Sequence, residues 1–255
     1  MIKDYLNQPE DVAGIGYIYP ISILEWEQFS SLAQRFLMIG YDHIKYRLPL
    51  KEEFNLMAYL IALCLNSEDE AVRIKNLEDF KTLIEMTVRK SVRFMYDKVS
   101  KEWFFFLDEE GDEHQINRHN FDDYRKIVMR QNLLFEPLVA PNPMAQQVID
   151  DAIMRMNKKG SPVDLESMIA LVSVVRGLTP DLLAGYSYYQ LRADFEVAQR
   201  IENNRIIHLY RCHGGKGNDI ELVAPLSINE NPYGFDKLFE KVDAEREQKL
   251  QKMLS

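Results

Sequence analysis

The sequence predicts an α+β protein that is mostly helical, with a small antiparallel β-meander in its N-terminal half and an all-helical C-terminal part. The runs "VRFMY", "WFFFL" and "EHQIN" are rich in β-favouring side chains and follow one another near residues 91–117. Apolar residues at helical spacing occupy most of the chain on either side of them. The stretch "EPLVAPNP", with its prolines, then separates the two halves.

The first elements are a short strand and two helices. In "GIGYIYPI", aromatic and β-branched side chains favour a strand, and Pro20 ends it. Ser22 stands three residues before Glu25, the spacing of a reciprocal helix cap, so we expect a helix over residues 22–39. The run "LKEEFNLMAYLIALCLN" is apolar on nearly every side beyond Phe54, which predicts a helix buried in the core.

The middle of the chain combines a helix, the meander and a further helix. Residues 77–86 have helical spacing, and "DEEGD" is a turn composition between the second and third β-rich runs. Asn120 is a candidate cap for the helix "FDDYRKIVMRQNLL". We therefore place an N-terminal α+β domain over residues 1–136 and a proline-rich linker over residues 137–142.

A helical domain is expected over residues 143–213. Its first helix covers residues 143–156, and Ser161 as cap, Pro162 at the first helical position and Gly177 as stop mark the second. A long helix begins at Ser187 and continues through "IIHLY". A continuous apolar stripe follows one face of it, formed by Tyr188, Leu191, Phe195, Ala198 and Ile201.

The last part of the chain is predicted to be a glycine- and proline-containing loop over residues 214–234, followed by a charged amphipathic helix over residues 235–255. The apolar positions of this helix lie among dense charge, which leaves too little apolar surface for a deep core. They include Phe235, Leu238 and Val242.

Charge and hydropathy exclude two classes of partner. The 40 acidic residues outnumber the 31 basic ones, and the resulting net charge of -9 argues against nucleic-acid binding and against anionic membrane surfaces. The longest apolar runs are far shorter than the roughly 20 residues that span a bilayer. We therefore expect a cytosolic protein, whose two cysteines stay apart as thiols.

The stretch "RCHGGKG" combines a thiol, an imidazole, an ammonium group and glycines. It lacks the serine or threonine and the strand-to-helix context of a phosphate-binding loop. His208 and Cys212 are one helical turn apart and His213 is adjacent, but zinc usually takes four ligands. We expect the stretch to end the long helix, with Gly214 and Gly215 supplying left-handed backbone.

No catalytic residue, metal site or cofactor is predicted. The acidic cluster in residues 108–113 fails the spacing of a calcium loop and is typical of a solvated turn. The chain contains no nucleophile elbow, zinc-protease or dinucleotide-binding pattern.

Three stretches carry a resemblance to a known family: "GIGYIYPISILEWEQFSSLA", "INRHNFDDYRKIVMRQNLL" and "LTPDLLAGYSYYQLRADFEVAQRIENNR". Together they look like the tail assembly chaperones and neighbouring tail-morphogenesis proteins of phages of Gram-positive bacteria, over roughly residues 14–204. The resemblance implies a non-enzymatic protein of the host cytoplasm that binds tail proteins such as the tape measure protein, as an oligomer along its client.

The resemblance makes two apolar surfaces candidate partner-binding sites. They are the stripe of Tyr188, Leu191, Phe195, Ala198 and Ile201, and the positions Phe235, Leu238 and Val242 of the last helix. Two alternatives stay open. One is a structural virion component, such as a connector or baseplate protein. The other is a metal-dependent hydrolase that uses His208, Cys212, His213 and the acidic hairpin.

Overall fold

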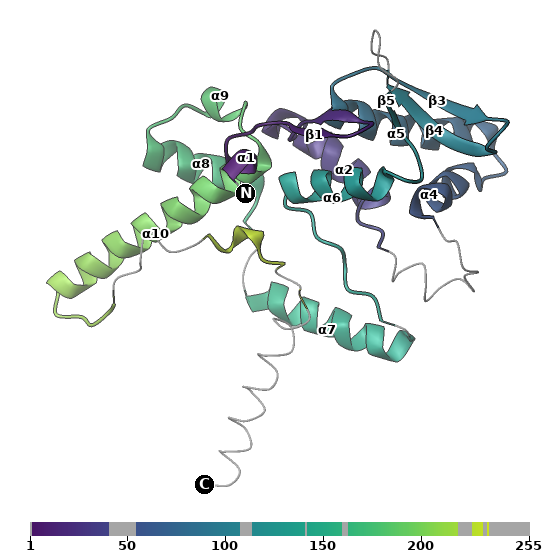
Figure 1. The fold of residues 1–255 in the computed structure, drawn as a ribbon. Helices are drawn as coiled ribbons and strands as arrows, with labels where there is room; N and C mark the ends of the chain where they lie inside the picture. Colours follow the sequence, from purple (N-terminus) through teal and green to yellow (C-terminus); the bar gives the residue numbers. More distant parts are fainter. Residues whose placement is uncertain are drawn as a thin grey trace.

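The computed structural model confirms the predicted α+β class. It describes residues 2–40, 55–107, 114–140, 142–159, 163–218, 226–231 and 234. Across these residues most of the chain is helical, and the strands form a two-stranded and a three-stranded antiparallel sheet. Figure 1 shows the sheets grouped with the N-terminal helices, while the later helices lie to one side of this group or below it.

The elements follow one another in two groups. The N-terminal group contains α1 (Ile2–Tyr5), β1 (Glu10–Val12), β2 (Gly16–Ile18), the 3-10 turn η1 (Ile23–Glu25), α2 (Trp26–Phe36), α4 (Leu56–Leu65), α5 (Glu70–Val88), β3 (Val92–Asp97), β4 (Glu102–Leu107), β5 (His114–Ile116) and α6 (Phe121–Gln131). The C-terminal group contains α7 (Pro143–Lys159), α8 (Leu165–Arg176), α9 (Pro180–Leu183), α10 (Tyr188–Cys212) and the 3-10 turn η2 (Ser227–Asn229).

The predicted meander is present as β3, β4 and β5. Its register pairs Val92 with Leu107, and Phe105 with Ile116. Because side chains alternate across a strand, these residues share one face of the sheet, and all are buried. The Phe80 ring of α5 meets the Phe105 ring edge to face at 5.0 Å between centroids, which joins the sheet to the helices.

The main core lies between this sheet and helices α2, α4, α5 and α6. Phe36 of α2 stacks on Phe80 of α5 with ring centroids 4.7 Å apart. Helix α4 is less enclosed than its sequence predicts, because Leu63 and Leu65 are exposed while Leu60 is buried. The strand expected near "YIY" is present as β2, and it pairs with β1, which no sequence signal indicated.

Several predicted caps act differently. The Ser22 hydroxyl donates to the Glu25 carboxylate at 2.7 Å and makes no cap bond to a backbone N–H group, and Arg89 also donates to that carboxylate at 2.5 and 2.7 Å. The Asn120 side chain accepts from the backbone N–H of Asn117 at 2.8 Å, so it closes the turn after β5 and makes no cap bond to α6.

The start of α8 also differs from its prediction. Asp164 is extended, and its carboxylate accepts from the backbone N–H of Ser167 at 2.6 Å, so the helix begins at Leu165. The predicted start at Ser161 and Pro162 lies outside the described residues. Gly177 ends the helix as expected, in left-handed backbone with φ of 67°.

Contacts connect the N-terminal group to α8 and α10. The backbone N–H of Ile23 donates to the Tyr186 carbonyl at 2.8 Å, and the Ile23 side chain enters the small core between α8, α9 and α10. At α1, the Tyr5 hydroxyl donates to Asp194 at 3.2 Å. The boundary at residues 137–142 stays a prediction, and these contacts show that the segments on its two sides pack together.

Candidate protein-binding surface

The candidate surface is on α10, which begins with a well-formed cap. The Ser187 hydroxyl accepts from the backbone N–H of Gln190 at 3.2 Å, and the Gln190 side chain accepts from the backbone N–H of Ser187 at 3.0 Å. This reciprocal pair satisfies N–H groups that a helix start otherwise leaves without partners. It fixes where α10 begins and therefore which of its side chains face α8.

The structure brings the predicted stripe together but covers it. Leu191, Phe195 and Ala198 are buried, with exposed fractions of 0%, 5% and 1%. Leu191 and Phe195 pack with Met168 and Val172 of α8. A partner could contact these side chains only by displacing α8.

The ends of the stripe are less enclosed. Tyr188 is half-buried and stacks on Trp26, and Ile201 is also half-buried. The other predicted binding residues, Phe235, Leu238 and Val242, lie outside the described residues.

The face of α10 that α8 covers continues as an exposed face. Leu209 follows Leu191 by eighteen residues, which is five turns of about 3.6 residues, so both lie on the same side of the helix. Ile206 follows Tyr188 by the same interval. Ile206, Leu209 and the neighbouring Tyr210 are exposed by 62%, 66% and 61%. We call these three residues the distal face.

The lengths of the two helices explain why the face emerges. α8 has 12 residues and α10 has 25, so at about 1.5 Å per residue α8 is roughly half as long. In Figure 1, α8 and α9 lie near the N-terminal half of α10, and the C-terminal half projects away from the other described helices and strands. A comparison of the two predicted lengths was the sequence signal that could have located the distal face.

The "RCHGGKG" stretch shapes the end of this face. Gly214 has φ of 83° and ends α10 in left-handed backbone, as expected. Gly215 does not share that conformation; its lack of a side chain leaves room for the Tyr210 ring, which a Cβ at that position would overlap. Arg211 Nε donates to the Gly217 carbonyl at 2.7 Å, which folds the turn back along the helix.

The metal interpretation of the same stretch gains no support from the geometry. Within the described ranges, no group of three or more His, Cys, Asp or Glu side chains is placed to hold a metal ion. His208, Cys212 and His213 are therefore not part of such a group in these ranges. Residues 108–113, the acidic hairpin of that hypothesis, lie outside the described residues.

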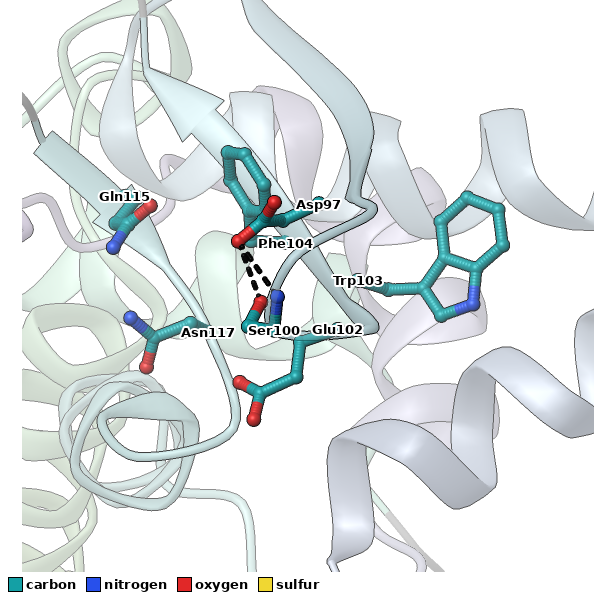
Figure 2. Close-up of a pocket in the computed structure, with 7 residues that line it drawn as sticks. All are labelled: Asp97, Ser100, Glu102, Trp103, Phe104, Gln115 and Asn117. Carbon is teal, nitrogen blue, oxygen red and sulfur yellow. Dashed lines mark hydrogen bonds between the residues drawn. The ribbon is translucent and has the colours of Figure 1, made fainter.

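A shallow hollow of about 160 Å³ lies at the β3–β4 hairpin (Figure 2). The Asp97 carboxylate accepts from the Ser100 hydroxyl at 2.7 Å and from the backbone N–H of Val99 at 2.9 Å, and these bonds lower the pKa of Asp97. Glu102 pairs with Arg118 at 2.9 Å, and Figure 2 shows the Trp103 indole pointing away from the hollow. Both carboxylates thus hold the local structure of the hairpin and of the turn after β5.

The two cysteines lie in different surroundings. Burial raises the pKa of the Cys64 thiol to about 11, so it stays protonated at neutral pH. Cys212 is exposed near the end of α10. The two thiols lie in different parts of the structure, as expected for unpaired cysteines.

Comparison with known proteins identifies no relative: no family model, curated protein or solved structure matches the chain. The resemblance to tail assembly chaperones therefore stays a prediction from the sequence. No helix among the described residues combines the length and the apolar character that crossing a membrane requires.

Proposed function

We propose that this protein is a non-enzymatic assembly factor that binds a helical segment of a phage tail protein, such as the tape measure protein, in the host cytoplasm. The observation that carries the proposal is the distal face, where the apolar side of α10 runs on beyond the end of α8. Its residues stand at positions i, i+3 and i+4, the spacing with which helices anchor one another.

The exposure of the distal face favours a partner over further packing within the described chain. Scattered apolar residues are normal on protein surfaces, but neighbouring ones on one helix face are typical of interaction sites. Ile206, Leu209 and Tyr210 form such a neighbouring set, and each is more than half exposed. The resemblance over residues 14–204 supplies the kind of client.

The proposal is tested by co-purification. The tagged protein is co-expressed with the products of its neighbouring genes, and bound proteins are identified by mass spectrometry. We expect a long, helix-rich tail protein to co-purify. Substituting Ile206 and Leu209 together by glutamine should remove it, because glutamine keeps a high helix propensity but removes the apolar anchors.

A matched control separates binding from a general surface effect. Val174 of α8 is 80% exposed and lies outside the distal face, so Val174→Gln should leave co-purification unchanged. Leu191 and Phe195 are unsuitable for this test because they are buried, and a polar residue there would disrupt the packing of α8 on α10. Normal co-purification with the Ile206/Leu209 double variant would refute the proposal.

The structural-virion alternative is distinguished by the finished particle. An assembly factor leaves its client before the tail is complete, whereas a connector or baseplate protein remains. Detection of the protein in purified particles in a fixed ratio to tail subunits would therefore favour the structural role.

A further inference from the structure

The end of α10 carries a charge opposite to that of the whole chain. Residues 199–217 contain four cationic side chains, Arg200, Arg205, Arg211 and Lys216, and a single carboxylate, Glu202. The chain as a whole has a net charge of -9. The apolar distal face is therefore set in a locally basic surface on an acidic protein.

Hydrogen bonds hold several of these cations close to α10. Arg211 donates to the Gly217 carbonyl at 2.7 Å, and Arg200 pairs with Glu196. Arg205 pairs with Glu202 at 2.5 Å, but the Arg205 side chain remains 66% exposed. Glu196 and Glu202 therefore neutralise two of the four cations, and Arg211 and Lys216 leave a net charge of +2 beside the distal face.

Two occupants of the distal face can be compared by charge: a second copy of this chain, and a partner with acidic side chains. If two copies of this chain paired through their distal faces, the basic segments would be brought together, and like charges across an interface are unfavourable. A partner with carboxylates beside its apolar stripe would instead place opposite charges along both edges of the contact. Rim charges of this kind mainly set the association rate and the preference between partners of opposite charge.

We propose that the distal face of α10 selects an acidic amphipathic helix, with apolar anchors three and four residues apart and glutamate or aspartate on its flanks. The inference rests on the proposed function for the site and adds the chemistry of the partner. The exposed half of α10 is on the order of 20 Å long at about 1.5 Å per residue, which matches a partner segment of about four turns.

The inference is tested with designed peptides, so no natural client is needed. Two fluorescein-labelled helical peptides share the same leucine stripe, one with glutamates and one with lysines on its flanks. Binding to the full-length protein is measured by fluorescence anisotropy. We expect the glutamate peptide to bind at least about tenfold more tightly, and raising the salt from about 0.05 to about 0.3 M to remove most of that difference.

Variants separate the charge from the apolar anchors. Leu209→Gln should abolish binding of both peptides, whereas Arg205→Glu with Lys216→Glu should weaken only the glutamate peptide, by about three- to tenfold. Val174→Gln serves as the control, and circular dichroism confirms that each variant retains its helical content.

The outcomes distinguish the inference from the proposed function. Equal binding of the two peptides, lost in Leu209→Gln, would overturn the acidic preference but leave the protein-binding role intact. Binding of neither peptide by the folded protein would overturn both. A dimer in sedimentation that dissociates in Leu209→Gln would show that a second copy occupies the face and would also overturn the inference.

Discussion

The indole ring of Trp26 stacks on the phenol ring of Tyr188, with centroids 3.8 Å apart and planes 9° from parallel. Trp26 is the first residue of α2, and Tyr188 is the first residue of α10. The pair lies beside the hydrogen bond from the Ile23 N–H group to the Tyr186 carbonyl. It therefore joins the N-terminal core to the helix that carries the distal face.

Removing either ring should destabilise the protein. We expect Trp26→Ala and Tyr188→Ala each to lower the free energy of unfolding by about 2–4 kcal/mol, because each deletes a large aromatic packed on its partner. In a double-mutant cycle the two should couple by about 1 kcal/mol. Urea unfolding followed by circular dichroism gives these values.

Leu182→Ala, at an exposed position of α9, should change stability by less than about 0.5 kcal/mol and serves as control. Additive losses would show that the stack contributes nothing of its own.

Local signals were sufficient for most elements of this fold. The β-favouring residues of β3 and β4 and the start of the long helix at Ser187 were predicted from short stretches of sequence, and the structure contains both features. β1 could not be found in this way, because "EDV" has little β propensity. It pairs with β2, and the contact of Glu10 with Arg130 of α6 helps to hold it there.

The candidate site shows more clearly what local sequence signals cannot predict. Leu191 and Leu209 are the same residue type on the same side of one helix, yet one is buried and the other is 66% exposed. Helical spacing identifies the apolar face but says nothing of how far a neighbouring helix covers it. That depends on where α8 begins and ends, and the cap at Asp164 placed its start later than the sequence predicted.

Thr87 and Tyr124 form a buried hydrogen bond whose direction can be predicted. The Thr87 hydroxyl has the Ile84 carbonyl as an acceptor at 2.8 Å, and Thr87 Oγ1 at 2.7 Å is the acceptor within reach of the buried Tyr124 hydroxyl, so we expect Tyr124 to donate to Thr87. Thr87→Val would leave the buried Tyr124 donor without this acceptor, and we expect a loss of about 2 kcal/mol in unfolding free energy.

The companion variant tests that direction. Tyr124→Phe removes the donor but leaves the Thr87 hydroxyl bonded to its carbonyl, so it should cost about 1 kcal/mol. The double variant leaves no stranded polar group at this contact and should cost less than the two single losses added together. Thermal or urea unfolding checks the order. A larger loss for Tyr124→Phe than for Thr87→Val would contradict it.

The two thiols should differ strongly in reactivity. Burial raises the pKa of Cys64 to about 11, whereas Cys212 is exposed on α10. Since the thiolate is the reacting form, Ellman's reagent at mildly alkaline pH should label Cys212 rapidly and Cys64 only after unfolding in urea. In Cys212→Ser the rapid phase should disappear. Rapid labelling that persists in this variant would mean that Cys64 is accessible in the folded protein.

Glu25 should make stability depend on pH. The hydrogen bonds from Arg89 and the Ser22 hydroxyl hold the pKa of Glu25 below its usual value, although partial burial opposes them. The folded protein therefore releases this proton more readily than the unfolded chain does. The pair stabilises the fold above the ordinary pKa of about 4.3, and its contribution is lost as the pH falls through the lower folded-state value.

Glu25→Gln isolates this contribution. At about pH 7 the variant should be less stable than the parent by about 0.5–1 kcal/mol, the range for a partly exposed pair, and the difference should shrink towards about pH 3. Urea unfolding at both pH values measures it. A stability difference of the same size at both would show that the Glu25 charge is not its cause.

The Tyr210 ring and Gly215 connect the glycine-rich turn to binding. A Cβ at position 215 would overlap the ring, and because the ring is the free end of a flexible side chain, it would move away at a cost of less than about 1 kcal/mol in stability. Gly215→Ala should therefore weaken client binding by about three- to tenfold, since Tyr210 is one of the anchors of the distal face.

Gly217→Ala is the matched control, because a Cβ there would only reach ordinary contact with Ile207 at 3.4 Å. If the ring carries the effect, Gly215→Ala should add nothing in a Tyr210→Ala background, and an additional loss there would assign the effect to the turn backbone.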